Sequence, residues 1–410
     1  MKKQTCKFSF MELYKKRISD LGRIVTGKTP RTSNAQNYGG DIPFLTPSDD
    51  LSGKFAPKTV KTITEIGLSE VRNCLLPSMS VCVSCIGSDL GKVVITNEPT
   101  VTNQQFNSII PTEENDTDFI YYLMTIIGKE LNYLSKTSTA VPIINKSTFA
   151  DFEIEVPSLE NQRRIAKVLS TLDDKIEVNR QINDNLEQQA QALFKSWFVN
   201  FEPFKDSEFV ESELGLIPQG WRVESLSSIA DYINGLAMQK YRPAEDETGL
   251  PVLKIKELGQ GCCDDNSELC SPSLIGEKYI IDDGDIIFSW SGTLMVKIWC
   301  GGKCGLNQHL FVVKPYNAPK WFAYQWTKHH LDNFIQIAKD KAVTMGHIKR
   351  GELDKAKVLV PDKDNLAKIS SLMIPIHRQI ISRKIESRRL SSLRDTLLPR
   401  LMSGMLTSMK

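Results

Sequence analysis

Two stretches of the chain carry the same long hydrophobic pattern, in which apolar residues recur at alternating spacings of four and three. In the first stretch the pattern runs through Ile165, Leu169, Leu172, Ile176, Asn179, Asn183, Leu186, Ala190, Leu193 and Trp197. In the second it runs through Ile369, Met373, Ile376, Ile380, Arg383, Ser387, Leu390, Arg394, Leu397 and Leu401. The pattern predicts two helices with a coiled-coil seam. Each helix is expected to span about 40 residues, or roughly 60 Å at 1.5 Å per residue.

Both seams become polar in the middle, at Asn179 and Asn183 in the first and at Arg383 and Ser387 in the second. Polar residues at such positions fix the register of a coiled coil at a cost in stability. Because the two helices are equal in length and belong to one chain, we expect them to pack on each other in antiparallel directions. The alternative is that each helix covers only its own domain.

Ahead of each long helix the pattern changes to short β-branched runs separated by Gly, Asn and Pro turns, which is typical of strands. We expect strands at 81–83, 93–95 and 108–110, and in the second half at 285–288 and 311–313. One amphipathic helix is predicted in each half, at 119–134 and 321–338. A last strand, at 153–156 and again at 357–360, leads to the proline before each long helix.

The two halves align with each other at an offset of about 204 residues, and an internal repeat of this kind indicates two copies of one architecture. Asn103-Gln104-Gln105-Phe106 matches Asn307-Gln308-His309-Leu310, and residues 84–88 match 289–293. Residues 18–24 correspond to 226–232, and Val156-Pro157 corresponds to Val360-Pro361.

The expected fold class is therefore α+β, with two tandem mixed α/β domains separated by two long helices that form an antiparallel coiled coil. The expected boundaries are 1–157 for the first domain and 158–200 for the first long helix. A linker and the second domain occupy 201–361, and the second long helix occupies 362–410.

Composition narrows the class of protein only slightly. A chain of 410 residues, 41% hydrophobic and 24% charged, fits two or three soluble globular domains. No apolar run approaches the roughly 20 residues that cross a bilayer, and the N-terminus lacks the apolar stretch of a signal peptide. We therefore expect a cytoplasmic protein with nine reduced cysteines and no membrane partner. A net charge of +2 does not by itself indicate nucleic-acid binding.

The segment Gly22–Thr29 matches the phosphate-loop pattern, which would make the chain a nucleotide hydrolase. That mechanism needs a helix directly after the Lys-Thr pair, because the helix N-terminus holds the phosphates. Here Pro30 follows at once, and the segment after it is rich in turn residues. We therefore expect Lys28 to lie on an exposed loop.

Cysteine and histidine patterns do not indicate a metal or catalytic site. Cys82 and Cys85 have a spacing that zinc sites use, but alternation along a strand would direct them to opposite faces. The five histidines all fall in the second half, without a repeated Ser, Asp or Cys partner in the first. The expected chain is not an enzyme and holds no metal.

Two phrases of the sequence stand near the openings of the two domains: residues 26–30 lead to 38–44, and the second domain opens on Leu214-Gly-Leu-Ile-Pro-Gln-Gly-Trp221. These phrases resemble the DNA-specificity subunits of type I restriction-modification systems. Residues 160–165 resemble the start of that family's first long helix, and 192–198 and 393–401 resemble the ends of its two helices. In two places the sequence departs from the family, since the first domain lacks a Pro-x-Gly-Trp opening and the second helix begins at Asp362-Lys-Asp-Asn.

This resemblance implies a non-catalytic reader of double-stranded DNA, with one target-recognition domain for each half of a split, asymmetric site. It also implies two methyltransferase subunits as partners, which bring S-adenosylmethionine. Restriction subunits, which bring ATP and Mg²⁺, are possible further partners. The chain itself would hold no cofactor.

Candidate base-reading residues are those with hydrogen-bonding side chains on loops that repeat in position. In the first domain they are Lys28, Arg31, Thr46, Ser48, Gln104 and Gln105. In the second they are Gln239, Lys240, Gln308, His309, Lys341, Thr344 and His347. The competing interpretation is that Asn103 and Asn307 only cap a turn. A rival class, a coiled-coil scaffold without a DNA role, gives no reason to duplicate a domain with divergent loops.

Overall fold

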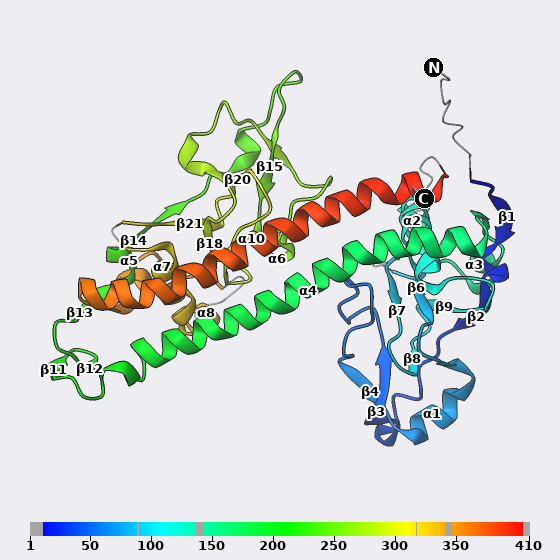
Figure 1. Ribbon diagram of the computed structural model, residues 1–410, viewed down its shortest axis with the longest axis horizontal. Helices are drawn as coiled ribbons and strands as arrows, with labels where there is room; N and C mark the ends of the chain where they lie inside the picture. The colour runs from blue at the N-terminus through cyan, green and yellow to red at the C-terminus, as the bar shows by residue number, and fades with distance from the viewer. Residues whose placement is uncertain (1–10, 88–89, 137–142, 317, 341–345, 405–410) are drawn as a thin grey trace, which may run out of the picture. The chain divides into compact units, whose positions relative to one another are not determined.

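The computed structural model describes residues 11–87, 90–136, 143–316, 318–340 and 346–404. The chain divides into two compact units (Figure 1). The first unit comprises 1–175 and 390–410, and the second comprises 176–389. Both long helices cross this boundary, so each unit contains one globular domain and a part of each helix.

The first unit is built on two four-stranded sheets. The main sheet is antiparallel and has the order β2-β9-β6-β7, with β2 at Gly22–Thr26, β6 at Val81–Ser84, β7 at Val93–Ile95 and β9 at Phe106–Pro111. The second sheet has the order β4-β3-β8-β5, with β3 at Tyr38–Leu45, β4 at Lys61–Ile63, β5 at Leu75–Leu76 and β8 at Thr100–Thr102. A separate antiparallel pair joins β1 (Tyr14–Arg17) to β10 (Glu153–Val156).

The main sheet of the first unit has a buried core on each face because its residues alternate in direction. Val81 and Val83 pack into the core formed with helix α2 (Thr117–Lys136), whereas Cys82 packs into the core shared with the second sheet. Cys85 joins the α2 side. Cys82 and Cys85 therefore face opposite cores, as the alternation predicts, and this geometry does not bring the two thiols to one metal ion.

The remaining helices of the first unit are short. Helix α1 (Glu65–Val71) is capped by Thr64, whose hydroxyl oxygen accepts a hydrogen bond from the Gly67 amide. Helix α3 (Lys146–Ala150) is capped in the same way by Asn145. Figure 1 shows β3, β4 and α1 grouped together, apart from α2 and the long helix.

The second unit repeats this topology. Its main sheet has the order β14-β21-β18-β19, with β14 at Ala230–Asn234, β18 at Ile286–Ser289, β19 at Met295–Ile298 and β21 at Leu310–Pro315. Its second sheet has the order β16-β15-β20-β17, with β15 at Leu250–Leu253, β16 at Leu269–Cys270, β17 at Ile280–Ile281 and β20 at Cys304–Leu306. The pair β13 (Arg222–Ser225) and β22 (Lys357–Val360) corresponds to β1 and β10. A hairpin of β11 (Phe209–Ser212) and β12 (Gly215–Pro218) lies in the linker.

The segment predicted as one helix at 321–338 forms two helices, α7 (Lys320–His329) and α8 (Leu331–Asp340). The prediction of a single helix was wrong because the break at His330 depends on a distant residue. The His330 Nε2 atom lies 2.8 Å from the carbonyl oxygen of Lys357, which holds the junction against β22. Short helices α5 (Leu226–Ile229), α6 (Ile255–Gln260) and α9 (Gly351–Lys355) complete the second unit.

The two long helices are α4 (Leu159–Phe198) and α10 (Lys363–Met402), each 40 residues long. All the apolar seam positions are buried or half-buried. In the first unit the Arg394 guanidinium of α10 contacts the Asp173 carboxylate of α4 at 2.6 Å. In the second unit Lys384 contacts Glu187 at 3.1 Å. The later residue of α4 thus pairs with the earlier residue of α10, so the two helices are antiparallel.

The polar middle of the seam forms one hydrogen-bonded layer. Asn179 donates from Nδ2 to the Glu386 carboxylate at 2.8 Å and accepts at Oδ1 from Arg383 at 3.3 Å. Asn179 and Arg383 are equivalent positions of the repeat, 204 residues apart. In an antiparallel pair related by a local twofold axis, equivalent positions meet only at the centre of the pair. The polar layer therefore marks the centre of the pairing.

Each long helix ends in the core of the domain that it does not follow. Ala190, Phe194 and Phe198 of α4 belong to the main core of the second unit. Leu398 and Leu401 of α10 belong to the main core of the first unit. The alternative in which each helix covers only its own domain is thereby excluded.

The segment that matches the phosphate-loop pattern is a strand and a turn. Gly22–Thr26 is β2, which pairs with β9 along its whole length. Gly27 packs so tightly on the Asn103 carbonyl that a Cβ atom would lie 2.1 Å from its oxygen. Among the described residues, the next helical segment is a single 3₁₀ turn at Ala35–Asn37. The helix N-terminus that nucleotide binding requires does not follow Lys28.

Candidate nucleic-acid interface

Four loop segments of the first unit meet at one end of its main sheet: 27–29, 85–87, 103–105 and 143–144. The end of β2, the end of β6 and the start of β9 lie together because Thr26 pairs with Asn107 and Ser84 pairs with Phe106. We call these segments the four-loop end of the first unit.

Backbone hydrogen bonds join the segments of this end to one another. The Cys85 amide donates to the Gln105 carbonyl at 2.7 Å, and the Ile144 amide donates to the Cys85 carbonyl at 2.9 Å. The Lys28 amide donates to the Thr102 carbonyl at 2.9 Å. The loops are thus held by the sheet and by each other, which positions their side chains without a ligand.

The second unit has an equivalent four-loop end, formed by 234–237, 290–292, 307–309 and 346–348. Asn234 pairs with Phe311 and Ser289 pairs with Leu310 at the matching edge of the sheet. The Gln308 amide donates to the Leu236 carbonyl at 2.8 Å, and the Ile348 amide donates to the Trp290 carbonyl at 3.1 Å. The same backbone frame therefore occurs twice, with different side chains.

Asn103 and Asn307 brace the central turn in the two units. The Asn103 side-chain oxygen accepts from the Gln105 amide at 3.1 Å, and the Asn307 oxygen accepts from the His309 amide at 3.2 Å. Both are buried. The turn-capping role weighed from the sequence is thus observed, and it leaves the next two side chains at the surface.

The first-unit candidates fall into two groups. Lys28, Gln104 and Gln105 lie on the four-loop end; the first two are exposed and Gln105 is half-buried. Arg31 is exposed just beyond it. Thr46 and Ser48 follow β3, where the Asn103 amide donates to the Leu45 carbonyl. Thr46 is buried and its hydroxyl donates to Asp49 at 3.0 Å, so it shapes that turn, while Ser48 is exposed.

The second-unit candidates lie mainly on its four-loop end. His309 and His347 are exposed and Gln308 is half-buried. Gln239 and Lys240 are exposed on the 3₁₀ turn after the loop at 234–237. Lys341 and Thr344 lie outside the described residues.

Sequence reasoning missed Trp290, which joins all four loops of the second unit. Its indole Nε1 donates to Asn234 at 3.0 Å, and its ring centroid lies 6.1 Å from that of His309 and 6.3 Å from that of His347. The aligned residue of the first unit is the small, buried Cys85. A tryptophan just after the apolar run at 286–288 was the signal available in the sequence.

His309 is held between two polar groups. Its Nδ1 lies 3.0 Å from the Ser291 hydroxyl and its Nε2 lies 3.3 Å from the Gln308 amide nitrogen. Activation of a serine requires the histidine nitrogen that faces it to accept its proton, while the other ring nitrogen donates to an orienting acceptor. Here the other nitrogen faces the Gln308 NH₂ group, which can only donate, so the arrangement does not orient His309 as a base.

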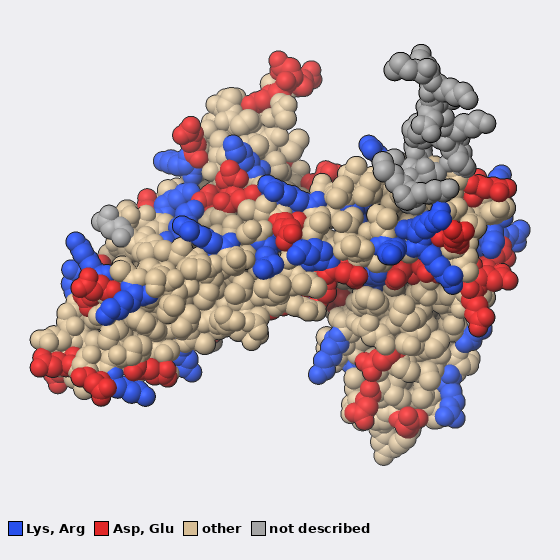
Figure 2. All heavy atoms as spheres, viewed as in Figure 1, with Lys and Arg blue, Asp and Glu red and all other residues tan. Residues whose placement is uncertain are grey.

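Charge gives little guidance to the interface. Figure 2 shows basic and acidic side chains interspersed over the long helices on the face drawn, with no large area of one sign. Within the described part of the chain, no cluster of His, Cys, Asp or Glu could hold a metal ion, and no helix is long and apolar enough to span a bilayer.

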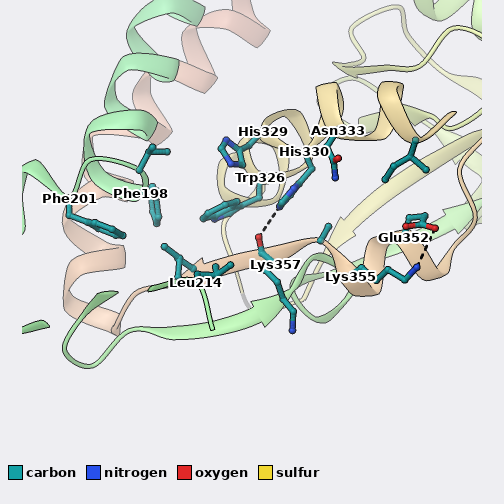
Figure 3. A pocket seen from close by; sticks show the side chains of 14 residues that line it. Phe198, Phe201, Leu214, Trp326, His329, His330, Asn333, Glu352, Lys355 and Lys357 are labelled. Carbon is teal, nitrogen blue, oxygen red and sulfur yellow. Dashed lines mark hydrogen bonds and ion pairs between the residues drawn. The ribbon is translucent and has the colours of Figure 1, made fainter. Parts of the chain in front are cut away.

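A half-open cleft of about 440 Å³ lies elsewhere in the second unit, between the end of α4, the linker and α7 (Figure 3). Phe198, Phe201, Leu214 and Trp326 form its apolar side, and His329 and His330 lie beside Trp326 (Figure 3). Burial lowers the pKa of both histidines. The residues lining the cleft include none from the four-loop end.

Residues 11–188 and 218–387 match the family described as type I restriction modification DNA specificity domain. The chain is 30% identical over 402 residues to the type I restriction enzyme MjaIX specificity subunit of Methanocaldococcus jannaschii, covering 95% of this chain and 92% of that protein. It is 37% identical over 172 residues to the HindI specificity subunit of Haemophilus influenzae, covering 40% of this chain and 37% of that one.

The fold is similar to that of a solved structure, the S subunit of the type I restriction-modification system of M. genitalium. The two share 16% identity with a TM-score of 0.53, over 98% of this chain and 97% of that one. At this identity the likeness supports the two-domain, two-helix architecture alone.

Proposed function

The chain belongs to the type I restriction-modification DNA specificity family, and from this premise we propose that it reads a split DNA target at the four-loop ends of its two units. The observation that carries the proposal is the duplicated loop frame with divergent side chains. A frame that repeats while its exposed residues differ fits two readers of different base sequences. The target would therefore be asymmetric, with two different half-sites separated by an unread gap.

The four-loop ends offer amides, imidazoles and hydroxyls, which are the groups that distinguish base edges in the major groove. Few of their described residues are cationic, and partner chains can share the phosphate contacts that contribute much of the affinity. We propose two methyltransferase subunits as these partners, with restriction subunits as possible further ones. S-adenosylmethionine, ATP and Mg²⁺ would be held by the partners, and this chain would supply sequence recognition without catalysis.

The test is to map methylated bases in the host genome with and without this gene. We expect a split motif of two unlike half-sites that disappears on deletion and returns on complementation. Co-purification should recover methyltransferase subunits with the tagged chain, and the purified chain alone should hydrolyse no nucleotide. Methylation that is unchanged by deletion would contradict the proposal and favour a scaffold role.

A further inference from the structure

The amide of Gln105 has an orientation that the chemistry of its neighbours fixes. The backbone N–H of Gln105 can only donate, and it lies 3.1 Å from Oδ1 of Asn103. The other end of the Asn103 amide is therefore its NH₂ group, which can only donate as well, and it lies 2.8 Å from Oε1 of Gln105. One of the two acceptor sites of the Gln105 carbonyl oxygen is thus used by Asn103, and the two bonds exclude the flipped amide.

The remaining group of Gln105, the Nε2 amide nitrogen, lies at the surface of the four-loop end of the first unit. A Cβ atom built on Gly87 would lie 3.6 Å from it, which places it over the loop at 85–87. No described residue hydrogen-bonds to it. The Gln105 carbonyl accepts from the Cys85 amide at 2.7 Å, so the backbone beneath this side chain is fixed too.

A glutamine that is free to rotate reads adenine with both ends of its amide, accepting from N6 and donating to N7. The bond from Asn103 fixes the Gln105 amide in one orientation and uses one of the two acceptor sites of its oxygen, so the Nε2 donor is the group left without a partner among the described residues. We propose that Gln105 is a specificity-determining residue that presents its Nε2 donor, and that in the first half-site it selects a base edge with an acceptor (guanine O6 or N7, adenine N7 or thymine O4) over cytosine, whose edge presents only a donor. This inference rests on the proposed function, because it assumes that the four-loop end meets DNA.

The second unit provides the contrast. The residue equivalent to Gln105 is His309, whose ring nitrogens face Ser291 and Gln308. The Asn307 side chain still accepts a hydrogen bond from the His309 backbone amide. The second unit has no counterpart of the side-chain bond between Asn103 and Gln105, because the side chain of His309 is not an amide. Changes to the Asn103–Gln105 pair should therefore alter reading of the first half-site only, and the second half-site serves as an internal control.

The test uses Gln105→Glu in the complex with its methyltransferase partners. Glutamate keeps an oxygen to accept from Asn103 and replaces the outward NH₂ with an acceptor of the same size. Affinity is measured for the wild-type site and for each single base-pair change, relative to unrelated DNA. We expect the preferred first half-site base to lose about tenfold or more in relative affinity, and cytosine, whose major-groove edge presents only a donor, to gain at one position.

Asn103→Asp provides a second route to the same change. One aspartate oxygen still accepts from the Gln105 backbone amide, while the other now accepts from Gln105 Nε2 and turns its oxygen outward. The same shift toward cytosine is expected with glutamine retained at 105. Thermal unfolding of each variant complex reports whether that variant is folded. If the Asn103→Asp complex does not fold, the result for Gln105→Glu alone tests the proposal.

The added carboxylate repels phosphates and lowers affinity for every DNA. The quantity compared is therefore the ranking of the four bases by relative affinity at each position of the site. An unchanged order, or a loss that is equal for all sequences, would overturn the inference and assign Gln105 a structural or phosphate-contacting role. A wild-type complex without any preferred split site would instead refute the proposed function itself.

Discussion

His377 shows how burial within the helix pair sets the chemistry of a single residue. Its ring packs edge-on against Tyr324 at 5.5 Å between centroids, and its Nε2 lies 3.4 Å from Gln325 Nε2. Glu187 of α4, Lys328 of α7 and Lys384 of α10 are the charged groups that face it. Burial lowers the pKa of His377 to about 4, and the two lysines act in the same direction against Glu187.

The pH dependence of stability follows from this shift. An unfolded histidine has a pKa of about 6.5, so the folded state resists protonation and loses stability as pH falls from that value toward 4. Between pH 7 and pH 5 the loss due to His377 should be about 2 kcal/mol. His377→Gln should remove that part of the loss in guanidinium unfolding at the two pH values, whereas replacing the exposed His347 with Gln should leave it. An identical pH dependence in the His377 variant would contradict the assignment.

At the scale of elements, the centre of the α4–α10 pair contains hydrogen-bonded polar side chains next to buried polar atoms whose hydrogen bonds are not all made. Asn179 is fully buried and also lies 3.3 Å from the Ser387 hydroxyl. The Nε atom of Arg383 and the Oδ1 atom of Asn183 are buried and have no hydrogen-bond partner among the described residues. Such a layer costs stability but disfavours any register in which these groups would face apolar residues.

A double-mutant cycle tests this layer. Asn179→Leu alone leaves Arg383 and Glu386 without the amide between them and should lower the free energy of unfolding by about 1–3 kcal/mol. Adding Arg383→Leu should recover much of that loss, because the orphaned group is removed with its partner. Arg180→Leu, on the exposed face of α4, should change stability by less than about 1 kcal/mol. Strictly additive effects at 179 and 383 would contradict direct coupling.

At the scale of the whole molecule, residues far apart in the sequence complete each unit. The first unit contains residues 390–410, whose Leu398 and Leu401 pack in one core with Ile165 and Leu169. Near them Asp173 accepts hydrogen bonds from Arg394 at 2.6 Å and from the Tyr122 hydroxyl at 2.5 Å. The C-terminal part of α10 therefore belongs to the first folded unit.

Substitutions in α10 should consequently weaken the first domain. Leu398→Ala and Leu401→Ala should each cost about 2–5 kcal/mol, because they leave cavities in a buried core. Hydrogen exchange should show reduced protection of the backbone amides in β6 and β9, about three hundred residues earlier in the sequence. Leu393→Ala, at a position 48% exposed, is the control and should have little effect. Loss of protection confined to α10 would contradict this account.

Features with a local period could be predicted from the sequence. The seam spacing predicted α4 and α10, and alternation predicted that Cys82 and Cys85 face opposite cores. The break between α7 and α8 could not be predicted, because it depends on the contact of His330 with Lys357. Trp290 was missed because its role comes from three loops that only the folded sheet brings together.

The sequence by itself determined the repeat, the two long helices and the family, since each is carried by local spacing or by order along the chain. The tertiary structure alone decided which helix end completes which core and which loops share an edge. It also decided that Gln105 offers a donor while Asn103 holds its oxygen. Whether a side-chain amide presents its donor or its acceptor depends on the partner that it meets in the folded protein, and the residue type at one position does not specify that partner.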